Sequence, residues 1–195
     1  MILVRSLLAA AGACLLAAGL HAETVTVGGV KYEDPIEVRG ARLQLNGAGV
    51  RYVTVLRYYT AALYLPKKAG SAEEALAMPG AKRLSVVALR EIDSGDLGKR
   101  FTRGVEDNME KTAFSKLVPG LLRMSQLFSD IKKLSPGDSF SIDWIPGTGT
   151  IISVKGVPQG EPFKEPEFFN ALLRIWLGPQ PADWKLKEHL LGKQG

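Results

Sequence analysis

Cysteine and histidine are scarce in this sequence of 195 residues, which contains one cysteine, Cys14, and two histidines, His21 and His189. Cys14 and His21 lie in an N-terminal segment that we expect to be removed, so the mature chain keeps one histidine and no cysteine. Such a chain cannot build Cys/His zinc sites, iron–sulfur clusters, thiol redox centres or Cys–His nucleophiles. We therefore expect no metal site and no cofactor.

Long hydrophobic runs are also missing, apart from one near the N-terminus. Residues 1–22 carry a single basic residue, Arg5, then the apolar run Leu7–Leu20, and end on Ala22. This pattern is typical of a secretory signal peptide, and the run is too short to span a bilayer comfortably. We expect cleavage after Ala22, and secretion across the inner membrane into the periplasm.

A strong excess of one charge is absent as well. Without Arg5 the chain has 24 basic and 20 acidic residues, a net charge of +4. The basic residues are scattered beside acids, which predicts a mixed solvated surface and no nucleic-acid binding, while weak contact with anionic lipid stays open. No linker or internal repeat divides residues 23–195, so we predict a single domain. The oligomeric state is not indicated.

Hydrophobic periodicity predicts strands first and helices later. Alternation at 24–27 and 42–46, and apolar or β-branched and aromatic composition elsewhere, indicate strands at 24–27, 30–32, 42–46, 50–65, 83–89, 139–145 and 150–154. Ser71 and Pro166 as helix starts, and four-residue spacing after Ser94, belong to helices expected near 71–78, 94–108, 114–131, 166–177 and 181–191. Gly47-Ala48-Gly49 is expected to turn the chain, a bulge or turn is expected near 56–58, and Pro119 is expected near a helix break. This order predicts an α+β fold, an antiparallel sheet with helices mostly on one face and an apolar crevice between them.

Glycine-rich and acidic motifs have ordinary structural explanations. Gly147-Thr148-Gly149-Thr150 lacks the Lys-Ser/Thr of a phosphate loop and is flanked by strands, so it predicts a hairpin turn. Asp93 and Asp96 stand at a helix start, where capping explains them. No spacing indicates a pair of catalytic carboxylates.

Three polar residues, Arg51, Tyr59 and Asn108, need a further explanation. If Val50–Tyr59 were one uninterrupted strand, Arg51 and Tyr59 would share a face. Arg51 lies in an apolar strand, either on a solvent face or on a pocket wall that carries a cation. Asn108 follows Phe101 by seven residues, so it shares the apolar side of its helix with Phe101 and Val105. A buried amide there would be hydrogen-bonded, either to backbone or to a ligand.

The same residues carry a resemblance to a known family. Leu45-Asn46-Gly47-Ala48-Gly49-Val50-Arg51, Tyr59–Pro66, the helix ending in Asn108, the hairpin 149–156 and Phe169–Gly178 follow one another as in the chalcone isomerase-like family, particularly its secreted bacterial branch. The resemblance covers nearly all the mature chain. It implies an open-faced antiparallel β-sandwich with a helical layer on one face and a ligand cleft between sheet and helices.

Enzymatic members of that family close a ring by attack of a phenolate on an enone. An arginine stabilises the negative charge, a tyrosine and a threonine hold a water, and an asparagine and a second threonine contact the substrate. Arg51 matches the arginine and Asn108 the asparagine. Phe101 stands where the catalytic tyrosine is expected, Tyr59 replaces the first threonine and Ile175 the second. If the chain is an isomerase, Arg51, Tyr59 and Asn108 are its catalytic candidates.

These departures favour binding over catalysis. Losing oriented donors to a developing oxyanion costs about 3–4 kcal/mol, whereas an arginine beside an apolar cleft suits a carboxylate with a greasy chain, and non-catalytic relatives bind fatty acids. We therefore predict a non-catalytic, cofactor-free protein that binds a fatty acid or similar amphipathic acid. The expected wall is Arg51, Tyr59, Leu63, Phe101, Val105, Asn108 and Ile175. The alternatives are an isomerase of the chalcone isomerase type and a scaffold protein with a vestigial cleft.

Overall fold

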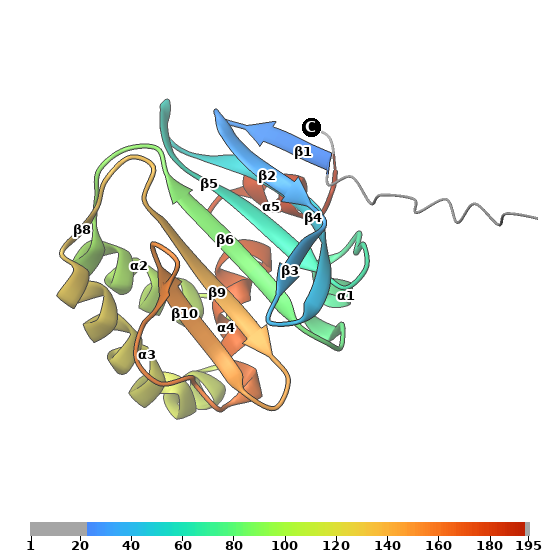
Figure 1. Cartoon of the computed structure of the whole chain (residues 1–195). Helices are drawn as coiled ribbons and strands as arrows, with labels where there is room; N and C mark the ends of the chain where they lie inside the picture. The colour runs from blue at the N-terminus through green and yellow to red at the C-terminus, as the bar shows by residue number, and fades with distance from the viewer. Residues whose placement is uncertain (1–22, 194–195) are drawn as a thin grey trace, which may run out of the picture.

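The computed structural model describes residues 23–193, so the signal peptide predicted at residues 1–22 lies outside the described residues. Seven strands form one antiparallel sheet in the order β11-β10-β9-β6-β5-β4-β3 (Figure 1). They are β3 (Ile36–Val38), β4 (Ala41–Val53), β5 (Leu56–Leu65), β6 (Lys82–Ala88), β9 (Ser139–Ile145), β10 (Gly149–Val154) and β11 (Val157–Pro158). Two further antiparallel pairs are β1 (Glu23–Val27) with β2 (Val30–Asp34), and β7 (Ile92–Asp93) with β8 (Lys133–Leu134).

Five helices accompany the sheet in the part of the chain that the structure describes. They are α1 (Ala72–Ala77), α2 (Ser94–Glu106), α3 (Lys111–Ile131), α4 (Pro166–Leu177) and α5 (Trp184–Leu190). The helix starts follow the expected chemistry, since the Ser71, Asp93 and Asp183 side chains each accept a hydrogen bond from a backbone N–H of the first turn. Pro166 occupies the first turn of α4, where its missing N–H costs nothing.

The two faces of the sheet are covered differently. Alternate residues of β5 explain this, because Tyr59, Ala61 and Leu63 face the helical layer while Ala62 and Tyr64 face the β1–β2 hairpin. The helical side holds the larger core, with α4 contributing buried residues along most of its length. The predicted α+β fold, an antiparallel sheet with its helices on one face, is confirmed.

The predicted turn at Gly47-Ala48-Gly49 is wrong, because these residues continue β4. The strand passes them with a register shift between Leu45 and Gly47, and α5 packs directly on the backbone there. A Cβ on Gly47 would overlap the carbonyl oxygen of His189, and one on Gly49 would lie 2.8 Å from the His189 side chain. The glycines allow a helix to approach a strand, which is a packing need and not a turn.

The bulge expected near 56–58 is confirmed, because Arg51 pairs with Tyr59 and Tyr52 with Arg57, which leaves Tyr58 as the extra residue. The turn of the hairpin precedes this bulge. β4 ends at Val53 and β5 begins at Leu56, so Thr54 and Val55 form the connection, and Thr54 takes a positive φ of 55°. Arg51 is paired directly with Tyr59 in the register of the two strands. Opposite residues of an antiparallel pair point to the same face, so Arg51 lies on the helical side with Tyr59.

The predicted break at Pro119 is also absent, since α3 runs from Lys111 to Ile131 through it. Pro119 and Ser115, whose carbonyl loses its partner, are both exposed, so the free carbonyl is accessible to solvent and the cost of the proline is reduced. Among the described residues no helix is both long and apolar enough to cross a membrane.

Candidate ligand cavity

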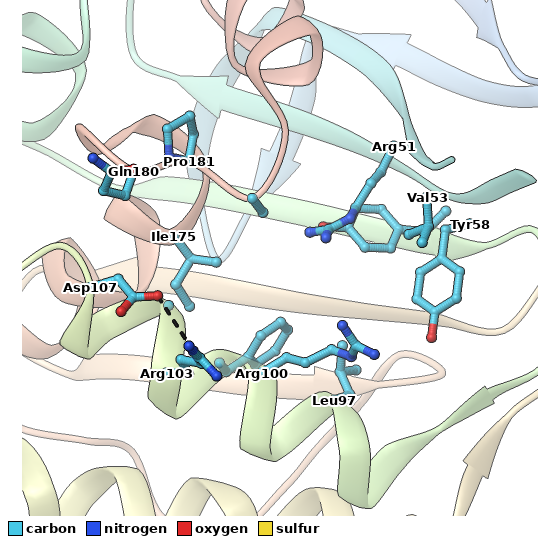
Figure 2. Close-up of a pocket in the computed structure, with 14 residues that line it drawn as sticks. Arg51, Val53, Tyr58, Leu97, Arg100, Arg103, Asp107, Ile175, Gln180 and Pro181 are labelled. Carbon is cyan, nitrogen blue, oxygen red and sulfur yellow. Dashed lines mark hydrogen bonds and ion pairs between the residues drawn. The ribbon is translucent and has the colours of Figure 1, made fainter. Parts of the chain in front are cut away.

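A cavity of about 240 Å³ opens between α2 and the end of the sheet nearest the β4–β5 turn. Its walls come from β4, β5, α2, α4 and the segment between α4 and α5 (Figure 2). The lining residues are Arg51, Val53, Tyr58, Tyr59, Leu97, Arg100, Phe101, Arg103, Gly104, Asp107, Ile175, Gln180, Pro181 and Ala182. The crevice expected between sheet and helices therefore exists, and four of the seven residues predicted for its wall, Arg51, Tyr59, Phe101 and Ile175, line it.

Arg51 lies half-buried on the sheet side of this cavity. Its Nη1 lies 3.5 Å from the Tyr59 hydroxyl, at the outer limit of a hydrogen bond, and its Cζ lies 5.7 Å from the Tyr59 ring centre. Its buried Nε has no hydrogen-bond partner, and no ion pair within the described residues involves this guanidinium. Arg51 thus keeps unused donor capacity beside an apolar space, which is the property needed to hold an anion.

Tyr59 forms the floor beneath Arg51. Its hydroxyl oxygen accepts a hydrogen bond of 2.8 Å from Trp176 Nε1, so two neighbours donate to the same oxygen. Burial raises the pKa of Tyr59, and the nearby Arg51 charge lowers it in part. The phenol therefore keeps its proton at neutral pH, and that proton has no acceptor among the hydrogen bonds of the described residues.

α2 supplies the opposite wall. Arg100, Arg103, Gly104 and Asp107 follow one another at intervals of three, one and three residues, which places them along one side of the helix. Arg103 pairs with Asp107 at 3.8 Å, whereas no ion pair within the described chain involves Arg100. Figure 2 shows Arg51 and Arg100 reaching toward the space from the sheet and from α2. Three arginines and one aspartate make this cavity cationic.

The inner end of the cavity is apolar. Phe101 is buried and packs edge-on against Phe128, Phe140 and Trp176, with ring centres 5.4 to 5.6 Å apart. Ile175 is buried beside it, and a Cβ on Gly104 would lie 3.1 Å from the Ile175 side chain. These side chains offer no hydroxyl, so the donors nearest to a bound molecule would come from Arg51, Arg100 and the tyrosines.

Three predicted wall residues do not line the cavity. Leu63 and Val105 have no exposed surface and belong to the core. The Asn108 amide donates to the carbonyl oxygens of Gly104 (2.8 Å) and Gln180 (2.9 Å) and accepts from the Gln180 N–H (2.8 Å). Asn108 therefore positions the segment after α4, and of the two explanations left open for it the structure places it on the backbone.

Sequence reasoning missed Tyr58, Arg100 and Arg103. Tyr58 precedes Tyr59 on β5 and was hidden in the expected bulge, while the two arginines have the spacing of an ordinary solvent-facing helix side. Their exposed positions are indistinguishable in the sequence from those of any surface arginine. Only the approach of α2 to the β4–β5 end turns that side into a wall.

The arrangement suits a molecule with an anionic head and an apolar body. A guanidinium with free N–H groups binds a carboxylate through charge-assisted hydrogen bonds, and Phe101, Leu97 and Ile175 offer apolar contact. The volume of about 240 Å³ lies just below the roughly 300–1,000 Å³ of most ligand sites. A long acyl chain would therefore extend beyond the cavity toward its mouth.

Comparisons with known proteins agree with the fold. The chain is similar in structure to an Arabidopsis thaliana fatty-acid binding protein, with a TM-score of 0.68 and 15% sequence identity over 87% of this chain and 96% of the other. A search of curated protein sequences found no match. The sequence model described as chalcone isomerase-like matches residues 24–192. The chain thus belongs to the chalcone isomerase-like family, as its motifs indicated.

Proposed function

We propose that this protein binds an amphipathic carboxylic acid, such as a fatty acid, with its carboxylate at Arg51 and its apolar part against Phe101 and Ile175. The single observation that carries the proposal is the Arg51 guanidinium, which lines the cavity beside its apolar end and forms no ion pair among the described residues. Its Nη groups, of which Nη1 has only a 3.5 Å contact with Tyr59, are the donors that a bound carboxylate would pair with.

The family and the similar structure support a binding role. The Arabidopsis protein of the same fold is titled a fatty-acid binding protein, and the cationic lining found here suits the same class of ligand. Tyr59 adds a neutral phenol whose free proton can be donated to the second carboxylate oxygen.

We also propose that the protein is not an isomerase. The family's ring closure needs oriented hydroxyl donors, and Phe101 and Ile175 stand where the tyrosine and the second threonine were expected, while Tyr59, which replaces the first threonine, is the one hydroxyl among the three. Phe101 is locked in an aromatic cluster with Phe128, Phe140 and Trp176, so no small shift brings a donor there. Mixing the protein with a hydroxylated chalcone should leave the rate of absorbance change at its uncatalysed value.

The decisive experiment compares acid binding by the wild type and by Arg51→Ala. Trp176 lies against Tyr59 and Phe101, so its fluorescence reports on the cavity during titration with medium- and long-chain fatty acids. A hydrogen bond to a charged group contributes about 1.5–3 kcal/mol, so Arg51→Ala should weaken binding by roughly 10- to 100-fold. Mass spectrometry of extracts from natively purified protein identifies the acid that co-purifies.

Two controls sharpen the result. Arg42→Ala removes an exposed arginine from the same strand, far from the cavity, and should leave the affinity unchanged. Replacing the acid by its methyl ester should weaken binding to the wild type, but not weaken binding to Arg51→Ala further. If Arg51→Ala binds the acid stoichiometrically and as tightly as the wild type, Arg51 is not the anchor. If the wild type binds no acid, the proposed function is wrong.

The proposed location is the periplasm, which rests on the sequence of residues 1–22 alone. Fractionation of the producing cell followed by N-terminal mass analysis should find the protein outside the inner membrane, beginning at Glu23. A cytoplasmic protein that retains Met1 would refute this.

A further inference from the structure

The tip of the β4–β5 hairpin presents an exposed apolar surface. Tyr52, Val53, Val55 and Leu56 are 46%, 39%, 86% and 50% exposed, and we call these four residues the hairpin tip. Figure 1 shows the hairpin extending past the end of β6 at the top of the view. Apolar residues gathered at one protruding turn are unlike the isolated exposed hydrophobics of an ordinary surface, and they mark an interaction site.

The hairpin tip is continuous with the mouth of the ligand cavity. Val53 belongs both to the tip and to the cavity lining, and Tyr58, three residues beyond Val55, lines the cavity as well. Arg51, the proposed anchor, precedes the tip by one residue. Whatever covers the tip therefore also faces the opening through which an acyl chain would enter.

The charges around the tip indicate the chemistry of that partner. Arg57 follows the tip directly and is exposed, and Arg100 stands across the cavity mouth on α2. Neither forms an ion pair within the described residues. An apolar tip with cations beside it complements the acyl region and the anionic headgroups of a bilayer, and Tyr52 has the amphipathic ring that favours the membrane interface.

We propose that the hairpin tip inserts into the interface of a membrane containing anionic lipid and holds the cavity mouth against it. The docking rests on the tip and its arginines and does not depend on the proposed ligand. The further idea that docking lets an acid pass between the bilayer and the cavity does rest on the proposed function. In that position the part of a long chain that the 240 Å³ cavity cannot enclose stays within the lipid and is not exposed to water.

The test is co-sedimentation with vesicles of phosphatidylcholine, with and without phosphatidylglycerol. The protein is purified as the cell produces it, with its N-terminus determined, so that every variant is compared at the same N-terminus. The wild type should bind the anionic vesicles, and added salt should weaken the binding. The affinity of the double variant Val55→Asp/Leu56→Asp for these vesicles should be lower by at least about tenfold, because the variant removes apolar contact and adds negative charges that the anionic lipid repels.

Leu122→Asp is the matched control. Leu122 is 65% exposed on α3, outside the tip and the cavity, and its replacement should leave vesicle binding unchanged. Thermal unfolding of both variants shows whether they remain folded, and the tip variant should bind fatty acid in solution as the wild type does. Vesicle binding without acid binding would refute the proposed function but not the docking. A wild type that ignores anionic vesicles, a tip variant that binds them equally well, or a tip-dependent dimer in place of vesicle binding would overturn the docking.

Discussion

The amide of Asn108 joins two parts of the chain that lie 72 residues apart, and its loss should destabilise the protein measurably. Its Nδ2 replaces a backbone N–H at the end of α2 by donating to Gly104, and its other hydrogen bonds hold both backbone groups of Gln180. Asn108→Ala removes all three hydrogen bonds. Each contributes about 0.5–1.5 kcal/mol, and since Gln180 is exposed, water recovers part of the loss. We expect a net destabilisation of about 2 kcal/mol.

Asn108→Asp separates this explanation from a simple loss of volume. The carboxylate still accepts from the Gln180 N–H, but its second oxygen faces the carbonyl oxygens of Gly104 and Gln180, which repel it. Asn108→Asp should therefore be no more stable than Asn108→Ala. Asn170→Ala is the control, because that side chain makes no hydrogen bond among the described residues.

Urea unfolding followed by tryptophan fluorescence measures these differences, and each kcal/mol should lower Tm by about 2–4 °C in a chain of this size. Acid titration distinguishes a positioning role from a ligand contact. Asn108→Ala should clearly lower the stability of the protein. It should weaken acid binding only slightly, because its sole effect on the cavity is the loss of the hydrogen bonds that hold Gln180 in the wall. A stable Asn108→Ala protein that has lost acid binding would refute the reasoning.

Two further predictions concern the packing of the sheet. Burial lowers the pKa of Lys82 from 10.5 to about 8, so above pH 8 the unfolded chain binds a proton that the folded chain lacks. Stability should rise by about 2 kcal/mol from pH 7 to 10 and then fall, because the raised pKa of Tyr59 acts in the opposite direction. Lys82→Met should abolish the rise in urea unfolding series and exposed Lys67→Met should keep it; a rise that survives in Lys82→Met would contradict the assignment. Gly47→Ala should lower stability by about 1–3 kcal/mol, since its Cβ overlaps the His189 carbonyl. Gly70→Ala is the control, because a Cβ there meets no atom within 4 Å. Equal melting temperatures of the two variants would contradict the prediction and show that α5 shifts to make room for the methyl group.

Local patterns predicted most elements because each depends on neighbours in the sequence. The tyrosine-, threonine- and leucine-rich composition of β5, the cap at Ser71 and the proline at the start of α4 are all short-range features, and each predicted its element correctly. Arg51 was the one site residue singled out by its own oddity, a cation within an apolar strand. The structure places it on the cavity wall.

Apart from the break expected at Pro119, the errors involve partners distant in the sequence. Gly47 was predicted to lie in a turn because the feature that requires a glycine there, the close approach of the α5 backbone, comes more than 140 residues later in the sequence. Asn108 was correctly placed on the apolar side of its helix, but its partner Gln180 could not be identified. Arg100 lies on a side of α2 that the sequence alone cannot distinguish from a solvent-facing side.

The contact between α5 and β4 has a consequence for the order in which the chain can fold. Asn46 donates to the Leu190 carbonyl, a residue synthesised 144 positions later, and bare glycine backbone beside it is covered by the same helix. Forming such a distant contact requires the intervening polypeptide to be available, which slows folding. A nascent chain leaving the ribosome therefore cannot close this seam until translation has reached α5.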